Sequence, residues 1–148
     1  MFDIQSRLNK YLIFLVEDND VDVEIFIYIL RQSRFSSIDM QRFCSVDAAI
    51  NALEHYQGNK HYILILFDLN MPGRSGRDLL LYVRQSRRWH ANPAIAFSTS
   101  LNPQDVAWCY ANGANSYINK AIDLQQFMKI VDITLRFWLE IAIWPCNR

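Results

Sequence analysis

The sequence predicts an α/β fold in which a doubly wound, five-stranded parallel sheet carries helices on both faces. Two continuous apolar runs, Tyr11–Val16 and Tyr62–Phe67, are too short for helices and have the length of strands buried on both faces. Segments with helical spacing follow each strand-like run, so the order β-α recurs five times in 148 residues. This alternation is typical of one domain, because parallel strands need a crossover, usually helical, between them.

The first half of the chain supplies two strand-helix units. Residues 1–10 form a polar arm, and the first strand precedes a helix that the apolar spacing predicts over 21–34. Residues 36–44 alternate weakly between apolar and polar side chains, which favours an outer strand. Ser45 is typical of a helix N-cap, and its helix is expected to end near Gly58.

The second half begins with two further units of the same kind. After the central strand, apolar spacing predicts a helix over 76–88, and residues 93–98 form a short strand. Asn102 and Pro103 suit the N-cap and first position of a fourth helix. Gly113 stands where a left-handed C-cap is expected.

A fifth strand over 116–119 precedes a last helix that begins with Asp123 as its cap and continues to about Trp144, before Pro145. Its apolar residues form two stripes. We expect one stripe to cover the sheet and the other to form a homodimer, together with the fourth helix and fifth strand. The stripes are Leu124, Met128, Val131, Leu135, Trp138 and Ala142, and Phe127, Ile130, Phe137, Ile141 and Trp144.

Composition narrows the classes of function. The chain carries 15 Lys and Arg against 15 Asp and Glu, so no net field would attract nucleic acid or an anionic membrane. Cys44, Cys109 and Cys146 are far apart and fit neither a disulfide framework nor a zinc knuckle, which suits a reducing compartment. No apolar run is long enough and free enough of charge to span a bilayer. We therefore expect a cytoplasmic protein with no nucleic-acid or membrane partner.

Acidic residues follow both central strands. Glu17 and Asp18 come directly after the first strand, and Asp68 ends the third. In a sheet of order 2-1-3-4-5, these carboxylates converge at the carboxyl edge, where such sheets bind ligands. Like charges about 4 Å apart repel by about 4 kcal/mol at an effective dielectric of about 20, so the site needs a cation. Oxygen ligands without His or Cys favour Mg²⁺; a role of Asp68 as a simple helix cap is the alternative.

Two more side chains complete the predicted site. Ser98 ends the fourth strand, and Lys120 follows the fifth strand. The Lys120 backbone lies two strands from Asp68, about 10 Å away at about 4.8 Å per strand, and a lysine stem bridges most of that. A phosphoryl group on Asp68 would have each oxygen met by metal, ammonium or hydroxyl. These residues therefore describe an aspartyl-phosphate site.

Four stretches together resemble the receiver domain of two-component response regulators. Any one of them is a weak signal, but four in the right order are specific. The resemblance implies the flavodoxin-like strand order 2-1-3-4-5 and a single receiver domain over 11–148, including the extended last helix. The stretches are LVEDND (15–20), FDLNMPGRSG (67–76), PAIAFSTS (93–100) and SYINK (116–120).

The resemblance implies a single-domain signalling protein and not an enzyme, with self-catalysed phosphotransfer and slow autodephosphorylation as its chemistry. Asp68 would accept a phosphoryl group from a sensor histidine kinase, and Ser98 and Lys120 would contact that group. Tyr117 would swing inward as Ser98 moves, and so change a surface that another, unknown protein reads. Mg²⁺ would be bound by Glu17, Asp18, Asp68 and the backbone carbonyl of Asn70.

The segment 136–141 is also similar to the dimeric regulators that serve cyanobacterial phytochrome kinases, which implies a phytochrome as the kinase partner. Two positions depart from the family pattern. Ala121 replaces the proline that usually follows the lysine, which leaves the Lys120-Ala121 bond cis or trans. Thr99 is bulkier than the usual alanine and narrows the approach to the site.

Two other classes of function compete with this interpretation. Asp18 followed by Asn19, Asp20 and Val21 is similar to the nucleophile motif of haloacid-dehalogenase-type phosphatases, although the acids after Lys120 all lie on the last helix. A non-phosphorylated interaction module of the same fold is the other alternative. Nucleotide-binding folds are disfavoured, because no glycine-rich phosphate loop follows a strand.

Overall fold

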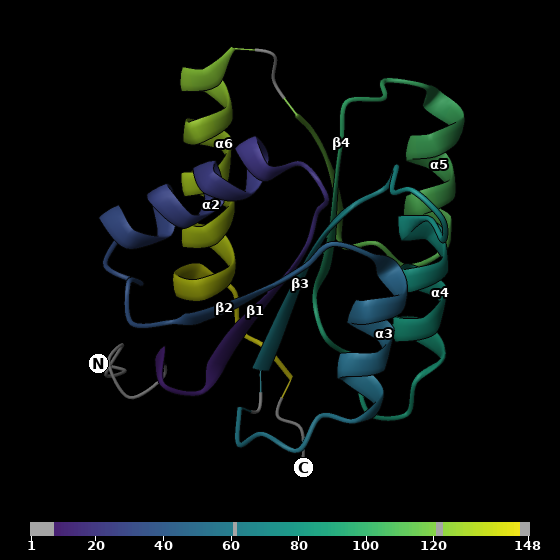
Figure 1. The fold of residues 1–148 in the computed structure, drawn as a ribbon, viewed down its shortest axis with the longest axis horizontal. Helices are drawn as coiled ribbons and strands as arrows, with labels where there is room; N and C mark the ends of the chain where they lie inside the picture. Colours follow the sequence, from purple (N-terminus) through teal and green to yellow (C-terminus); the bar gives the residue numbers. More distant parts are fainter. Residues whose placement is uncertain (1–7, 61, 121–122, 146–148) are drawn as a thin grey trace.

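The computed structural model describes residues 8–60, 62–120 and 123–145. Its five strands form one parallel sheet in the predicted order β2-β1-β3-β4-β5 (Figure 1), with β2 at an edge as expected. Because β1 and β3 lie side by side inside the sheet, the residues that follow them meet at one edge. The strands are β1 (Tyr11–Val16), β2 (Asp39–Phe43), β3 (Tyr62–Asp68), β4 (Ala94–Ser98) and β5 (Ser116–Asn119).

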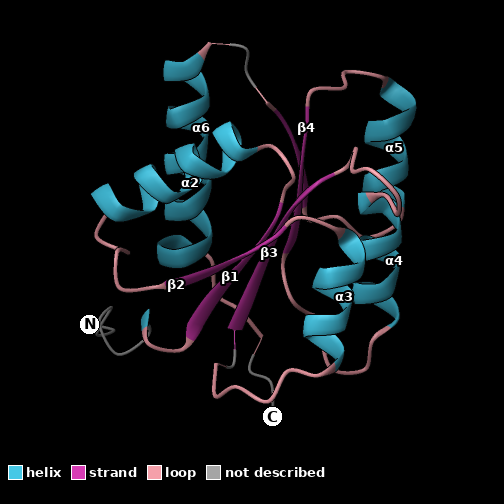
Figure 2. Ribbon diagram, viewed as in Figure 1, coloured by secondary structure: helices cyan, strands magenta, loops and turns pink. Residues whose placement is uncertain are grey.

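Helices cover both faces of the sheet (Figure 2). α2 and α6 lie on one face, and α3, α4 and α5 lie on the other, which confirms the doubly wound architecture. Each helix returns the chain toward the start of the next strand, so every strand ends at the same rim. The helices are α2 (Asp20–Gln32), α3 (Val46–Glu54), α4 (Gly76–Gln85), α5 (Pro103–Ala111) and α6 (Leu124–Arg136).

The central strands bury both of their faces, as their continuous apolar runs predict. All six residues of β1 are buried. Leu12, Phe14 and Val16 enter the core beneath α3 and α4, whereas the alternate residues enter the core beneath α2 and α6. This alternation follows from the two-residue period of a strand, and it holds β1 tightly enough to fix the position of Glu17.

Some elements end earlier or begin later than predicted, because turns with their own hydrogen bonds replace the expected ends. β2 begins at Asp39, since the N–H of Ile38 donates to the carbonyl of Phe35 at 2.9 Å and closes a turn. α4 ends at Gln85, and the turn after it buries Trp89 in the core. α3 also stops short of its predicted end. These differences leave the sheet and the site unchanged.

The last helix differs most from its prediction. α6 ends at Arg136 and continues as a π-helical turn, η1 (Phe137–Ile141). The two predicted stripes do not keep to separate faces, because Phe127 of one stripe and Val131 of the other lie four residues apart on the same buried face of α6. Some buried residues belong to one stripe, some to the other, and Leu139 belongs to neither. Leu124, Phe137 and Ile141, which do belong to the stripes, are exposed. The buried apolar residues of this segment are Phe127, Val131, Leu135 and Leu139.

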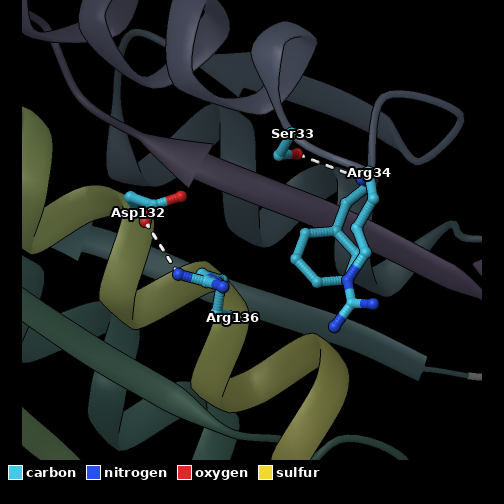
Figure 3. Close-up of a pocket in the computed structure, with 5 residues that line it drawn as sticks. Ser33, Arg34, Asp132 and Arg136 are labelled. Atoms are coloured by element: carbon cyan, nitrogen blue, oxygen red, sulfur yellow. Dashed lines mark hydrogen bonds and ion pairs between the residues drawn. The ribbon is translucent and has the colours of Figure 1, made fainter.

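A hollow of about 380 Å³ lies between the end of α2 and α6 (Figure 3). α2 starts at the carboxyl rim of the sheet and runs back, so this hollow lies near the opposite rim. Its arginines already have acidic partners: Arg34 pairs with Glu140, and Arg136 lies 3.6 Å from Asp132. The hollow therefore offers no free positive charge for an anion. Its lining residues are Ser33, Arg34, Phe35, Asp132 and Arg136.

None of the helices in the described part of the chain has the length and apolar character that crossing a membrane requires. Leu8, within the arm predicted over 1–10, is buried in the core beneath α2 and α6. The boundary between arm and domain stays a prediction.

Candidate functional site

Three carboxylates meet at the carboxyl rim of the sheet. Val16 pairs with Phe67 across β1 and β3, so Glu17 and Asp18 lie beside Asp68. One oxygen from each carboxylate lies within 4.8 Å of the other two. Glu17 is buried, Asp68 is mostly buried and Asp18 is exposed, which leaves the cluster open to solvent on one side.

The loop after β3 fixes the position of Asp68 through backbone hydrogen bonds. The N–H of Asn70 donates to Asp68 Oδ1 at 2.9 Å, and the N–H of Gly76 donates to the Leu69 carbonyl at 3.0 Å. A Cβ at Gly76 would lie 2.4 Å from the Asp68 carbonyl oxygen, so this close approach requires glycine. α4 then begins with a capping box between Ser75 and Asp78. The Gly76 contact thus brings the start of α4 against the end of β3.

Lys120 follows the edge strand β5 and extends its side chain toward the acids. Its backbone N–H donates to the Ser98 carbonyl at 2.8 Å, which continues the pairing of β4 and β5. Its ammonium nitrogen lies 2.6 Å from Glu17 Oε2 and 3.0 Å from Asp68 Oδ2. The lysine stem therefore spans from β5 to β1, and the whole side chain is only 7% exposed.

Burial and charge act together on this cluster. Burial raises the pKa of Glu17 to about 7, against the lowering effect of its hydrogen bond from Lys120. Burial acts to lower the pKa of Lys120, but its hydrogen bonds to Glu17 and Asp22 outweigh it, and the pKa is raised. Lys120 is therefore an ammonium ion at neutral pH. Glu17 is the acid here whose charge is sensitive to a nearby cation, because a cation favours the carboxylate form.

Ser98 and Tyr117 lie on the neighbouring strands β4 and β5. Ser98 is fully buried, and its Oγ accepts from the Asn70 side-chain amide at 3.3 Å and from the N–H of Ser100 at 3.1 Å. The Tyr117 hydroxyl donates to the Ser100 carbonyl at 2.8 Å. Ser100 is thus hydrogen-bonded both to Ser98, the predicted hydroxyl donor, and to Tyr117, the predicted switch residue.

Two residues of this rim were not expected from the sequence. Asp22, in the first turn of α2, lies 2.9 Å from the Lys120 ammonium. Arg42, on β2, donates to the backbone carbonyls of Glu17 and Asp18, each at 3.1 Å. The acid-rich run after β1 was a signal for Asp22, but a helical residue there is more often a solvated capping acid. Whether the Lys120-Ala121 bond is cis or trans stays open, because Ala121 lies outside the described residues.

The comparisons with known proteins agree with this arrangement. The family model described as response regulator receiver domain matches residues 13–132. The chain belongs to the response regulator receiver domain family. It is therefore a signalling receiver, and the family match favours this interpretation over the phosphatase alternative.

Two known proteins are similar to the chain over most of its length. Response regulator Rcp1 of Synechocystis sp. is 29% identical over 136 residues, which cover 90% of this chain and 92% of Rcp1. The probable methanogenesis regulatory protein FilR2 of Methanothrix harundinacea is 26% identical over 140 residues, covering 93% and 89%. The similarity thus extends beyond the receiver motifs alone.

Solved structures give the same result in three dimensions. The phosphorylated cyanobacterial phytochrome response regulator RcpA superposes with a TM-score of 0.84 at 30% identity, covering 90% of this chain and 97% of RcpA. The Mn²⁺-bound form of response regulator Rcp1 gives a TM-score of 0.82 at 30% identity, covering 91% and 99%. These similarities confirm the flavodoxin-like receiver fold.

Proposed function

We propose that this receiver accepts a phosphoryl group from a histidine kinase on Asp68 and passes the signal to another protein through its surface. One observation carries the proposal: the Asp68 carboxylate lies in a cluster of acids with an ammonium group 3.0 Å away. That arrangement pairs a nucleophilic oxygen with a fixed positive charge that can meet the incoming phosphoryl oxygens.

The acids fit a bound Mg²⁺. Glu17, Asp18 and Asp68 offer carboxylate oxygens within 4.8 Å of one another, and the exposed Asp18 leaves room for the waters that Mg²⁺ retains. The Asn70 carbonyl is the fourth proposed ligand, from the residue whose N–H already contacts Asp68. When bound, Mg²⁺ would neutralise charge on the transferring phosphoryl group. The Mn²⁺-bound Rcp1 structure supports a divalent ion in a similar protein.

The protein residues have separate parts in the transfer. One Asp68 oxygen forms the bond to phosphorus as the bond from phosphorus to the donor nitrogen breaks. Lys120 donates to a phosphoryl oxygen, and the Ser98 hydroxyl donates to another while its Oγ keeps accepting from Ser100. Tyr117 follows, because its hydroxyl is bonded to the Ser100 carbonyl. A coupling of about 1–3 kcal/mol through this route shifts partner affinity by about 5- to 150-fold.

The partners of this protein are proposed from its relatives and its surface. A phytochrome is the proposed kinase, since RcpA is a phytochrome response regulator. A homodimer is proposed through α5, β5 and α6, because Phe137 and Ile141 expose apolar surface on the last helix at 46% and 67%. The balanced charge supports a cytoplasmic protein without a nucleic-acid or membrane partner.

Small phosphoryl donors test the assignment directly. The chain is incubated with acetyl phosphate and Mg²⁺, and the intact mass and the labelled peptide are measured by mass spectrometry. We expect one added phosphoryl group on Asp68 in the wild type and none in Asp68→Asn. A label on Asp18 would support the phosphatase alternative. No label on a folded, Mg²⁺-loaded wild type would support the interaction module instead.

A further inference from the structure

The Lys120 ammonium is fully engaged by three carboxylates. Its nitrogen lies 2.6 Å from Glu17, 2.9 Å from Asp22 and 3.0 Å from Asp68. A lysine ammonium has three N–H donors, so each carboxylate takes one of them. The direction of the donor toward Asp68 is therefore set by the two other bonds, because the four atoms around a tetrahedral nitrogen constrain one another.

Asp22 is placed for this contact by the start of α2. Its backbone is held in place, because the Asp22 N–H donates to the side chain of Asn19, the N-cap of the helix, at 3.1 Å. Its side chain is 21% exposed and turns in toward the lysine. In the described part of the chain, the carboxylates close enough to share one cation are Glu17, Asp18 and Asp68, and Asp22 is outside that group. Asp22 thus contacts the lysine without belonging to the metal cluster.

We propose that Asp22 is a positioning residue for phosphotransfer to Asp68. Together with Glu17 it holds the Lys120 ammonium at two points, so that the third N–H faces Asp68 before transfer and a phosphoryl oxygen after it. The inference rests on the proposed function of Asp68 and Lys120, and it adds a residue from a helix that otherwise supplies no part of the site.

The bonds that form and break during phosphotransfer explain why the Lys120 ammonium needs both Glu17 and Asp22 as fixed partners. An Asp68 oxygen forms the bond to phosphorus as the bond between phosphorus and its donor breaks, and the donor leaves with that electron pair. Once phosphorylated, the Asp68 carboxyl group is part of an acyl phosphate, loses its own negative charge and becomes a weaker acceptor. The Lys120 donor then turns to a charged phosphoryl oxygen nearby, while its bonds to Glu17 and Asp22 persist. Without Asp22, one donor is unpaired and the flexible lysine stem loses its orientation.

Phosphorylation rates of the full chain test this role. Wild type, Asp22→Ala, Asp22→Asn and Glu24→Gln are compared with acetyl phosphate at saturating Mg²⁺. Glu24 is a matched control, because it is an exposed acid two residues further along α2. We expect Asp22→Ala to react about tenfold more slowly, the effect of losing one charge-assisted hydrogen bond. Asp22→Asn should lie between, since it keeps an acceptor, and Glu24→Gln should match the wild type. Equal rates for all four would overturn the proposal.

A double-mutant cycle separates positioning from general damage to the fold. If Asp22 acts through Lys120, replacing Asp22 by Ala in a Lys120→Met background causes no further slowing. Slowing by the same factor in both backgrounds would show that Asp22 acts independently of the lysine, and the proposal would be wrong. An unlabelled wild type would instead contradict the proposed function itself, so the two failures are distinguishable.

Discussion

The Glu17 carboxylate accepts a hydrogen bond from the Lys120 ammonium at 2.6 Å, with both side chains buried where β1 and β5 end. Burial raises the pKa of Glu17 to about 7 all the same, so Glu17 titrates near neutral pH. Because its pKa is raised in the folded state, the folded chain binds the extra proton. This contribution to stability is complete below the ordinary value of 4.5 and is lost as the pH rises through 7.

Magnesium binding should therefore release a proton from Glu17. Below pH 7 the metal competes with that proton, so its apparent affinity should fall by up to about tenfold per pH unit. Calorimetry at pH 6 in two buffers of different ionisation enthalpy measures the proton release. Glu17→Gln should bind Mg²⁺ more weakly and lose the pH dependence. Binding at pH 6 without proton release would contradict the prediction.

The contact of Gly76 with the end of β3 predicts a cost for any side chain there. A Cβ would lie 2.4 Å from the Asp68 carbonyl oxygen and 2.9 Å from the Leu69 Cα, which are backbone atoms that cannot move aside separately. Gly76→Ala should lower the free energy of unfolding by about 1–3 kcal/mol. Urea unfolding measures it. Gly58→Ala is the control, since the three atoms nearest its Cβ all belong to the Tyr56 side chain and not to the backbone, and an equal loss in both variants would refute the explanation.

Local signals predicted most of the fold. The buried strands β1 and β3 follow from apolar runs, and Ser45 and Asn102 cap the helices that their side chains predict. Each of these signals acts on residues close in the chain, so no knowledge of the sheet is needed. The strand order also follows, because crossover rules leave few alternatives and the resemblance chooses among them.

The features that the sequence did not predict depend on contacts between residues far apart in the chain. Asp22 and Lys120 are 98 residues apart, and no local pattern indicates that the Asp22 side chain turns toward the lysine. The π-helical turn after Arg136 is equally hidden, since its residues have ordinary helical spacing in the sequence. The packing of Trp144 against Tyr11 and Tyr62 is another contact between residues far apart in the chain.

Arg84, near the end of α4, joins three parts of the chain. Its guanidinium donates to the carbonyl of Gly113 at 2.7 Å, to that of Asn92 at 2.8 Å and to the Asn115 side chain at 2.8 Å. Burial lowers its pKa. Arg84→Met should lower the free energy of unfolding by about 3 kcal/mol, because several carbonyls lose their donor.

The neighbouring Arg87 gives a matched control for Arg84. It is exposed in the turn that follows α4, so Arg87→Met should change the free energy of unfolding by less than about 0.5 kcal/mol. Urea unfolding of both variants makes the comparison. Equal effects would show that the loss of one positive charge, and not the loss of the Arg84 contacts, sets the change in stability.

Trp144 tests whether the domain extends to the end of the described chain. Its ring packs edge-on against Tyr11 at 5.0 Å and Tyr62 at 5.6 Å, and its Nε1 donates to the Trp138 carbonyl at 2.9 Å. Trp144→Ala should cost about 3–5 kcal/mol of unfolding free energy. Ile143→Ala, at a residue 90% exposed, should cost almost nothing. If both variants unfold like the wild type, the segment after η1 is not part of the folded domain.

The proposed homodimer predicts that charge on the outer face of the last helix prevents association. Ile141 is 67% exposed, and burial of such side chains between two copies would drive dimerisation, so Ile141→Glu should be monomeric. Sedimentation velocity at several concentrations measures the state. Val21→Glu is the control, because Val21 is 65% exposed on α2, outside the proposed interface, and should leave the dimer intact. Dimers in both variants would place the interface elsewhere, and a monomeric wild type, with and without phosphorylation, would exclude it.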